Sequence, residues 1–277
     1  MIPVIRSVVY LILATLITAP FGFLVTVAVV LPMRVRFWLI SVWRAGFMAI
    51  CRYVLGLHYR VVGRENIPAT PSIIFSKHQS AWETVGLQAI FPDQVFVLKK
   101  SLLMIPFLGW AFAAVKMISI DRKAGKDALR QVIDQGCERL KAGYWVVIFP
   151  EGTRVAPGEK RRFKTGGAHL AVASGALLVP VAHNAGEFWA RNAFVKTPGI
   201  ITVSIGPAID PAGRTADEIT AIAEQWIDNE MRQISPRHYA AETTAAAHAP
   251  LPEKVRGGLR MASWISVLGM NCFEALV

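Results

Sequence analysis

The chain has 277 residues, 53% of them hydrophobic, and it carries 30 Lys and Arg against 19 Asp and Glu. This apolar fraction exceeds the roughly 45–50% of average soluble domains, which argues against an ordinary soluble protein. The net charge of +11 is compatible with partners that carry anionic groups: lipid, phosphorylated substrates or nucleic acid. Three cysteines have neither disulfide nor metal-ligand spacing, so we expect no disulfide framework and no bound metal.

The chain begins with an apolar segment, because residues 7–33 contain no charged side chain. As a helix they are long enough to cross a bilayer with tilt, and too long for the apolar core of an ordinary signal peptide. We therefore interpret them as a retained anchor. Pro20 allows two arrangements, a kink in one span or the turn of a shallow re-entrant hairpin.

Residues 34–52 follow with four arginines on one side of a helical wheel and aromatic residues among them. This pattern suits an interfacial helix, and an ordinary amphipathic packing helix is the alternative. The first unit, residues 1–56, is thus expected to be a membrane anchor and interfacial helix. Arginines beyond the apolar run predict that the following domain lies at the cytoplasmic face of the (inner) membrane. Residues 99–164 hold 14 Lys and Arg against 6 Asp and Glu, which favours contact with anionic lipid.

Seven short β-rich runs alternate with helix candidates over residues 57–238. This alternation predicts an α/β domain with a mainly parallel, mixed sheet of about seven strands flanked by helices. The remaining residues, 239–277, have the composition of a linker and an apolar tail. The runs begin near residues 59, 72, 95, 117, 144, 177 and 201, and the helix candidates are 80–91, 101–114, 124–142, 165–174 and 215–233.

A first polar cluster, "SKHQSAWETVG", follows the run at 72 and places His78 five positions before Glu83. Residues five apart on a helix diverge by roughly 140°, so they do not share a face. The two can meet if His78 lies in a strand-to-helix loop and Glu83 in the first turns of the helix, with Ser76 or Ser80 as the cap. The alternative is a non-catalytic capping box of Ser80 and Glu83 beside a partly buried histidine.

Two further polar clusters follow predicted strands, in "MISIDRKAGK" and "YWVVIFPEGTR". The carboxyl ends of strands in α/β sheets are where ligands bind. Gly152 would let backbone N–H groups approach an anion, and Arg154 offers a fork of donors suited to phosphate. Taken alone, however, Asp121 and Arg122 could form a surface ion pair, and Gly152 a tight turn beside a solvated arginine.

The blocks "HQSAWE", "ISIDR", "FPEGTR" and "LLVPVA" resemble, in order and spacing, those of the 1-acyl-glycerol-3-phosphate acyltransferase family. The resemblance covers about residues 60–210, and Glu83 stands where the family most commonly has Asp. It implies a glycerol-phosphate acyltransferase-like fold, with His78 as general base on the acceptor hydroxyl and Glu83 orienting the imidazole. It also implies an acceptor pocket formed by Arg122, Glu151, Gly152, Thr153 and Arg154. Lys77 and Lys164 are weaker candidates for this pocket, placed there by their charge and their proximity in sequence.

The expected reaction moves an acyl group from acyl-CoA or acyl carrier protein to the sn-2 hydroxyl of 1-acyl-glycerol 3-phosphate, a lysophospholipid, giving phosphatidic acid. We expect no cofactor, no metal and no nucleic-acid partner. Alternative acceptors are glycerol 3-phosphate and a lyso-aminolipid such as lyso-ornithine lipid. An alternative of another class is a noncatalytic, basic protein that binds membrane surfaces, against which the pairing of His78 with Glu83 argues.

Overall fold

The computed structural model describes residues 1–239, so the predicted linker and tail from residue 240 onward lie outside the described part. Its centre is a seven-stranded sheet in the order β1-β7-β6-β2-β5-β3-β4. β6 and β7 pair antiparallel, and the neighbours on either side pair parallel, which confirms the predicted mainly parallel mixed sheet. The strands are β1 (Leu57–Val62), β2 (Ile73–Ser76), β3 (Gln94–Lys99), β4 (Ile118–Ile120), β5 (Trp145–Ile148), β6 (Leu178–His183) and β7 (Gly199–Ile205).

The central strand β2 lies between β5 and β6, and Phe75 is in register with Ile148 on one side and Pro180 on the other. Because these three strands run parallel, their carboxyl ends meet at one edge of the sheet. The segments that follow β2, β5 and β6 are therefore neighbours although the sequence separates them widely. All residues of β2 and β5 are buried, as expected of parallel strands that are covered on both faces.

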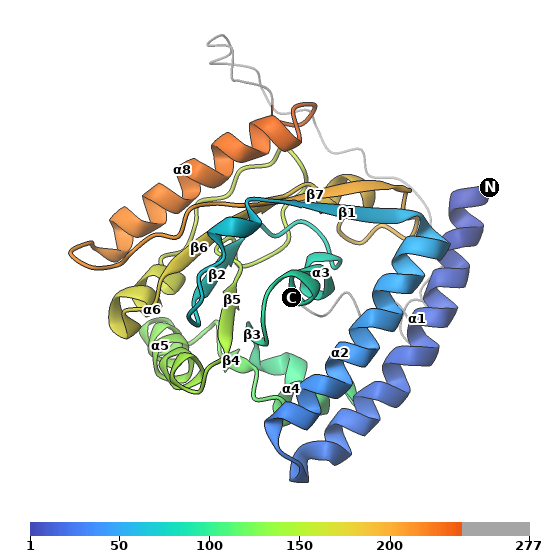
Figure 1. Cartoon of the computed structure of the whole chain (residues 1–277), viewed down its shortest axis with the longest axis horizontal. Coiled ribbons are helices and arrows are strands. Elements are labelled where there is room, and N and C mark those ends of the chain that lie inside the picture. The colour runs from blue at the N-terminus through green and yellow to red at the C-terminus, as the bar shows by residue number, and fades with distance from the viewer. Residues whose placement is uncertain (240–277) are drawn as a thin grey trace.

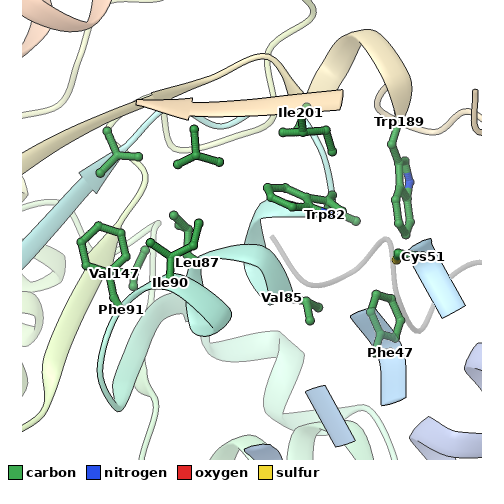
Figure 2. Close-up of a cluster of buried hydrophobic side chains, with 14 of the residues drawn as sticks. Phe47, Cys51, Trp82, Val85, Leu87, Ile90, Phe91, Val147, Trp189 and Ile201 are labelled. Atoms are coloured by element: carbon green, nitrogen blue, oxygen red, sulfur yellow. The ribbon is translucent and has the colours of Figure 1, made fainter. Parts of the chain in front are cut away.

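Helices cover both faces of the sheet (Figure 1). On one face, Ile73 and Phe75 join a core cluster with side chains of α5, α6 and α8. On the other, Ile74 and Val147 belong to a cluster with Trp82 and α3, shown in Figure 2, which Phe47 of the second N-terminal helix extends. The helices of the domain are α3 (Glu83–Ile90), α4 (Leu108–Ala114), α5 (Lys126–Lys141), α6 (Gly166–Ser174), α7 (Ala185–Phe188) and α8 (Ala216–Ile234).

The helix expected at 101–114 is divided. A short 3₁₀ helix, Lys100–Met104, precedes α4, and Pro106 lies between them. A residue that precedes proline is disfavoured in the α conformation, so Ile105 is extended and the helix cannot continue through this point.

The N-terminal segment forms two helices, α1 (Ile2–Val27) and α2 (Met33–Ile50), which lie side by side (Figure 1). Both are long and apolar enough to cross a membrane, by length and composition, and they suit the predicted anchor. The two helices form a hairpin whose turn lies at residues 28–32. Pro20 lies inside α1, so the alternative in which the chain turns at Pro20 is wrong.

Specific contacts fasten this helix pair to the α/β domain. Arg44 donates to the carbonyl oxygen of Gln88 at 2.6 Å, and Arg36 donates to that of Ala114. At the other end of the pair, the hydroxyl oxygen of Ser7 accepts a hydrogen bond of 3.0 Å from the backbone N–H of Lys196. Two of the four arginines in residues 34–52 thus bind the domain, which supports the packing-helix alternative for α2.

Candidate active site

His78 and Glu83 meet at the carboxyl end of β2. His78 lies in the loop 77–82, Glu83 is the first residue of α3, and His78 Nδ1 lies 2.6 Å from Glu83 Oε1. The same carboxylate oxygen accepts the backbone N–H groups of Gln79 at 2.9 Å and Ser80 at 2.8 Å. A spacing of five residues therefore brings the pair together because the loop folds back over the start of α3.

The expected serine caps are wrong. The residue at the cap position of α3 is Trp82, which makes no side-chain capping bond. The hydroxyl of Ser80 instead accepts a hydrogen bond of 3.1 Å from the backbone N–H of Trp82, and that of Ser76 donates to the carbonyl oxygen of Lys77 at 3.0 Å. The loop is consequently held by the carboxylate of Glu83 and by its own short-range bonds.

The surroundings favour the neutral imidazole and the ionised carboxylate. Burial lowers the pKa of His78, an effect that its bond to Glu83 only partly offsets. For Glu83, burial alone would raise the pKa, but His183, His78 and the backbone N–H of Ser80 together hold it below its ordinary value. Since an ionised carboxylate only accepts hydrogen bonds, we assign the imidazole proton to Nδ1, which leaves the lone pair on Nε2.

Nε2 of His78 is the ring nitrogen that is left to accept a proton. It has no hydrogen-bond partner among residues 1–239, although the imidazole is fully buried. The ring is stacked on Phe149, with centroids 4.1 Å apart and planes at 16°. Phe149 was not singled out from the sequence; its place directly before "PEGTR" was the available signal. The stacking and the bond to Glu83 together fix the direction of the Nε2 lone pair.

Glu151 and Lys77 form a buried ion pair beneath the loop. The second carboxylate oxygen of Glu151 accepts the backbone N–H of His78 at 2.7 Å. Burial acts most strongly on Lys77 and lowers its pKa, but the attraction of Glu151 and weaker contributions leave that pKa raised. Both residues were expected in the acceptor pocket, and that role stays a prediction. In the structure they are enclosed, and Glu151 holds the main chain of the loop 77–82.

The turn at Gly152 gathers cationic side chains from separate elements. Gly152 has φ +69°, and Arg122, which follows β4, donates to its carbonyl oxygen at 2.8 Å. The ammonium nitrogen of Lys164 lies 3.0 Å from the position that a Cβ on residue 152 would occupy. Any larger residue would therefore be strained and would press on Lys164. Thr153 is half-buried at the same turn.

Arg154 is only 6% exposed, and its charge contributes to lowering the pKa of His78. Its carbonyl oxygen accepts a hydrogen bond of 3.0 Å from Arg191. Sequence reasoning missed Arg191, because it lies in a loop outside every strand-end pattern. The structure thus brings Arg122, Arg154 and Lys164 to the segment that begins at Gly152, on the same edge of the sheet as His78.

His183, at the end of β6, is a further buried residue that the sequence patterns did not single out. Its Nε2 donates to the carbonyl oxygen of Lys77 at 2.8 Å, and its Nδ1 accepts from the backbone N–H of Ala185 at 3.3 Å. Within residues 1–239, no group of three or more His, Cys, Asp and Glu side chains could hold a metal ion. The chemistry that these side chains offer is proton transfer beside a cationic turn.

Comparison with known proteins shows which sequences this chain resembles. The family model described as Acyltransferase matches residues 58–184, which include both polar loops. A 1-acyl-sn-glycerol-3-phosphate acyltransferase of Pseudomonas aeruginosa is 45% identical over 214 residues, which is 76% of this chain and 83% of the relative. The Saccharomyces cerevisiae protein of the same name is 34% identical over 187 residues, 66% of this chain and 61% of the relative.

The fold also has a counterpart among solved structures. The crystal structure of a 1-acyl-sn-glycerophosphate (LPA) acyltransferase from Thermotoga maritima superposes with a TM-score of 0.70. The match covers 83% of this chain and 94% of that one, at 23% sequence identity. At that identity the likeness concerns the fold.

Proposed function

The chain belongs to the 1-acyl-sn-glycerol-3-phosphate acyltransferase family, and on that premise we propose that it acylates the sn-2 hydroxyl of 1-acyl-glycerol 3-phosphate to form phosphatidic acid. The donor is an acyl thioester, acyl-CoA or acyl carrier protein. The observation that carries the proposal is the buried pair of His78 and Glu83. Nε2 of His78 makes no hydrogen bond to residues 1–239, and the pair lies at the same edge of the sheet as the turn at Gly152.

His78 acts as general base in this reaction. Nε2 takes the proton of the acceptor hydroxyl as its oxygen attacks the thioester carbonyl, and Glu83 stabilises the imidazolium that forms. When the tetrahedral intermediate collapses, the carbon–sulfur bond breaks and the proton passes from Nε2 to the departing thiolate. Because the acyl group arrives activated, direct transfer requires no serine nucleophile.

The cations at the second loop bind the acceptor phosphate. Arg122 and Lys164 reach the turn at Gly152 from different elements. The charge of Arg154, two residues after that glycine, acts on His78 and contributes to lowering its pKa. Guanidinium groups suit phosphate because their planar fork of donors matches its oxygens. A phosphate held there would place the glycerol moiety toward Nε2.

The helix pair α1 and α2 holds the enzyme at the membrane in which a lysophospholipid resides. The basic segment 99–164 then meets anionic lipid at the cytoplasmic face. Because the imidazole of His78 is fully buried, an acceptor reaches it only when covering side chains move aside. The same burial keeps water away from the base and limits wasteful hydrolysis of the thioester.

The test measures release of free thiol by the purified full-length protein with acyl-CoA or acyl carrier protein as donor. The acceptors are 1-acyl-glycerol 3-phosphate, glycerol 3-phosphate and lyso-ornithine lipid. We expect His78→Ala to lower turnover about 10²- to 10⁴-fold, the usual contribution of a positioned general base. His58→Ala, an exposed histidine on β1, is the matched control and should retain full activity.

Near-normal turnover in His78→Ala with an unchanged circular dichroism spectrum would contradict the catalytic role of His78. A preference for another acceptor would reassign the substrate. Binding to anionic vesicles without thioester consumption by the wild-type protein would favour the noncatalytic alternative.

A further inference from the structure

The segment that follows α8 turns back toward the catalytic loop. Residues 235–239 form a turn in which the backbone N–H of Tyr239 donates to the carbonyl oxygen of Ser235 at 3.1 Å. Ser235 is buried and its hydroxyl bonds to Glu187, while the side-chain amide of Asn184 donates to the carbonyl oxygen of Ile234 at 3.3 Å. These contacts attach the segment to the residues that follow β6.

Tyr239 lies within the domain, with only 6% of its surface exposed, although a linker was expected to begin there. Its hydroxyl oxygen accepts a hydrogen bond of 2.8 Å from Nε2 of Gln79. Its ring lies 5.9 Å from the ammonium nitrogen of Lys77. One hydroxyl thus joins the segment after α8 to the catalytic loop.

Gln79 transmits this contact to the catalytic pair. Its side chain is fully buried, and its Oε1 has no partner among residues 1–239, so the bond to Tyr239 holds the amide in its orientation. Its backbone N–H donates to Glu83 Oε1, the oxygen that also contacts His78. A displacement of Gln79 would therefore reach the carboxylate that orients the imidazole.

We propose that Tyr239 is a positioning residue for catalysis, which acts through Gln79 on Glu83. This inference rests on the function proposed above. Tyr239 lies beyond residues 58–184, the part that the family model matches. The hydroxyl makes the contact to Gln79, and the ring makes the contact to Lys77, so the two contributions can be separated by mutation.

The test compares Tyr239→Phe with the wild type, because Phe keeps the ring and removes the hydroxyl. We expect kcat to fall about threefold to tenfold, the equivalent of one hydrogen bond of roughly 0.5 to 1.5 kcal/mol, with the KM of both substrates unchanged. A carboxylate that receives a weaker N–H bond is more basic and supports the imidazolium better. The acidic limb of the pH–rate profile should therefore move to higher pH, which loss of packing alone would not cause.

Gln79→Met removes the same bond from its other side and is a second variant should Tyr239→Phe fold poorly. The kcat of the double variant Tyr239→Phe/Gln79→Met should lie within a factor of about two of the kcat of Gln79→Met alone, since the effects of coupled residues are not additive. Tyr144→Phe is the matched control. Tyr144 stacks on Phe37 directly before β5, at the opposite end of the sheet, and its loss of a hydroxyl should leave kcat and the acidic limb unchanged.

A kcat of Tyr239→Phe within a factor of about two of the wild type would overturn the inference. So would a lower kcat with an unmoved acidic limb, because the effect would then not pass through Glu83. The proposed function fails separately: it falls if His78→Ala stays active, whatever Tyr239→Phe does.

Discussion

The loops that follow β2 and β5 begin at the same edge of the sheet and differ in their exposure to solvent. Every residue of the first loop, 77–82, is buried, and its polar groups bind Glu83, Glu151 and His183. The second loop starts buried at residues 149–151 and then opens, so that Gly152 and Thr153 are half-buried and Lys164 is exposed. Proton transfer gains from fixed groups away from water, whereas phosphate capture needs cations that a charged ligand can reach.

The largest expected effect comes from opening the pair that joins the two loops. Glu151→Ala leaves the ammonium of Lys77 buried without its partner, and such losses typically cost about 3–5 kcal/mol of stability. The measurement is urea unfolding of the protein in detergent micelles, followed by tryptophan fluorescence. Arg130→Ala, which breaks an exposed ion pair with Asp134, is the control and should cost less than about 0.5 kcal/mol.

The double variant Lys77→Met/Glu151→Leu should recover most of that stability, because no buried charge is left unpaired. A loss below about 1 kcal/mol in Glu151→Ala would mean that the pair does not hold the loops together.

The second prediction concerns the open loop. Arg122→Ala should lower kcat/KM for the phosphate-bearing acceptor roughly tenfold to a hundredfold, since charge-assisted hydrogen bonds contribute about 1.5–3 kcal/mol. Hydrolysis of the acyl thioester by water should stay within about twofold, because water has no phosphate to bind. Arg122→Lys should recover activity only in part, since an ammonium lacks the planar fork.

Transfer and hydrolysis are measured side by side, also in Arg154→Ala. Equal losses in both activities would withdraw the phosphate-binding role. Arg154 is more deeply buried than Arg122, so its variant also requires an unfolding measurement.

The third prediction concerns protonation in the closed loop. In the proposed mechanism a neutral His78 is the base. Burial lowers its pKa, so the acidic limb of the kcat/KM profile should lie below the ordinary histidine value of about 6.5. Glu83 raises that pKa; Glu83→Gln should therefore move the limb to still lower pH and lower the plateau about tenfold. A limb above pH 6.5 in the wild type, or one that moves upward in Glu83→Gln, would contradict the assignment.

The smallest expected effect is that of salt on membrane binding through the apolar helices α1 and α2. If α1 and α2 anchor the protein by apolar contact, the membrane-bound fraction of the full chain should change by less than about twofold between 0.1 and 1 M salt, although salt screens surface attraction. Detergent should release the protein. Sedimentation of membranes followed by immunoblotting measures both. Complete release by salt alone would show that basic residues, and not the helix pair, hold the protein at the membrane.

The sequence by itself determined the seven strands and the position of the His78–Glu83 pair. Strands buried on both faces appear as continuous apolar runs, and short-range patterns of this kind are visible without a structure. His78 lies in the loop 77–82 and Glu83, five residues later, begins α3, so the contact between them is local. The family motifs are local in the same sense.

Only the tertiary structure decided which residues support that pair. Lys77 and Glu151 are 74 positions apart, and they meet because β5 pairs with β2 in the sheet. Gln79 and Tyr239 are 160 positions apart, and no local pattern distinguishes Tyr239 from a linker residue. Contacts of this kind depend on the order of strands and on where α8 ends. The periodicity of a single segment carries no information about either, because it records only which side of that segment is buried.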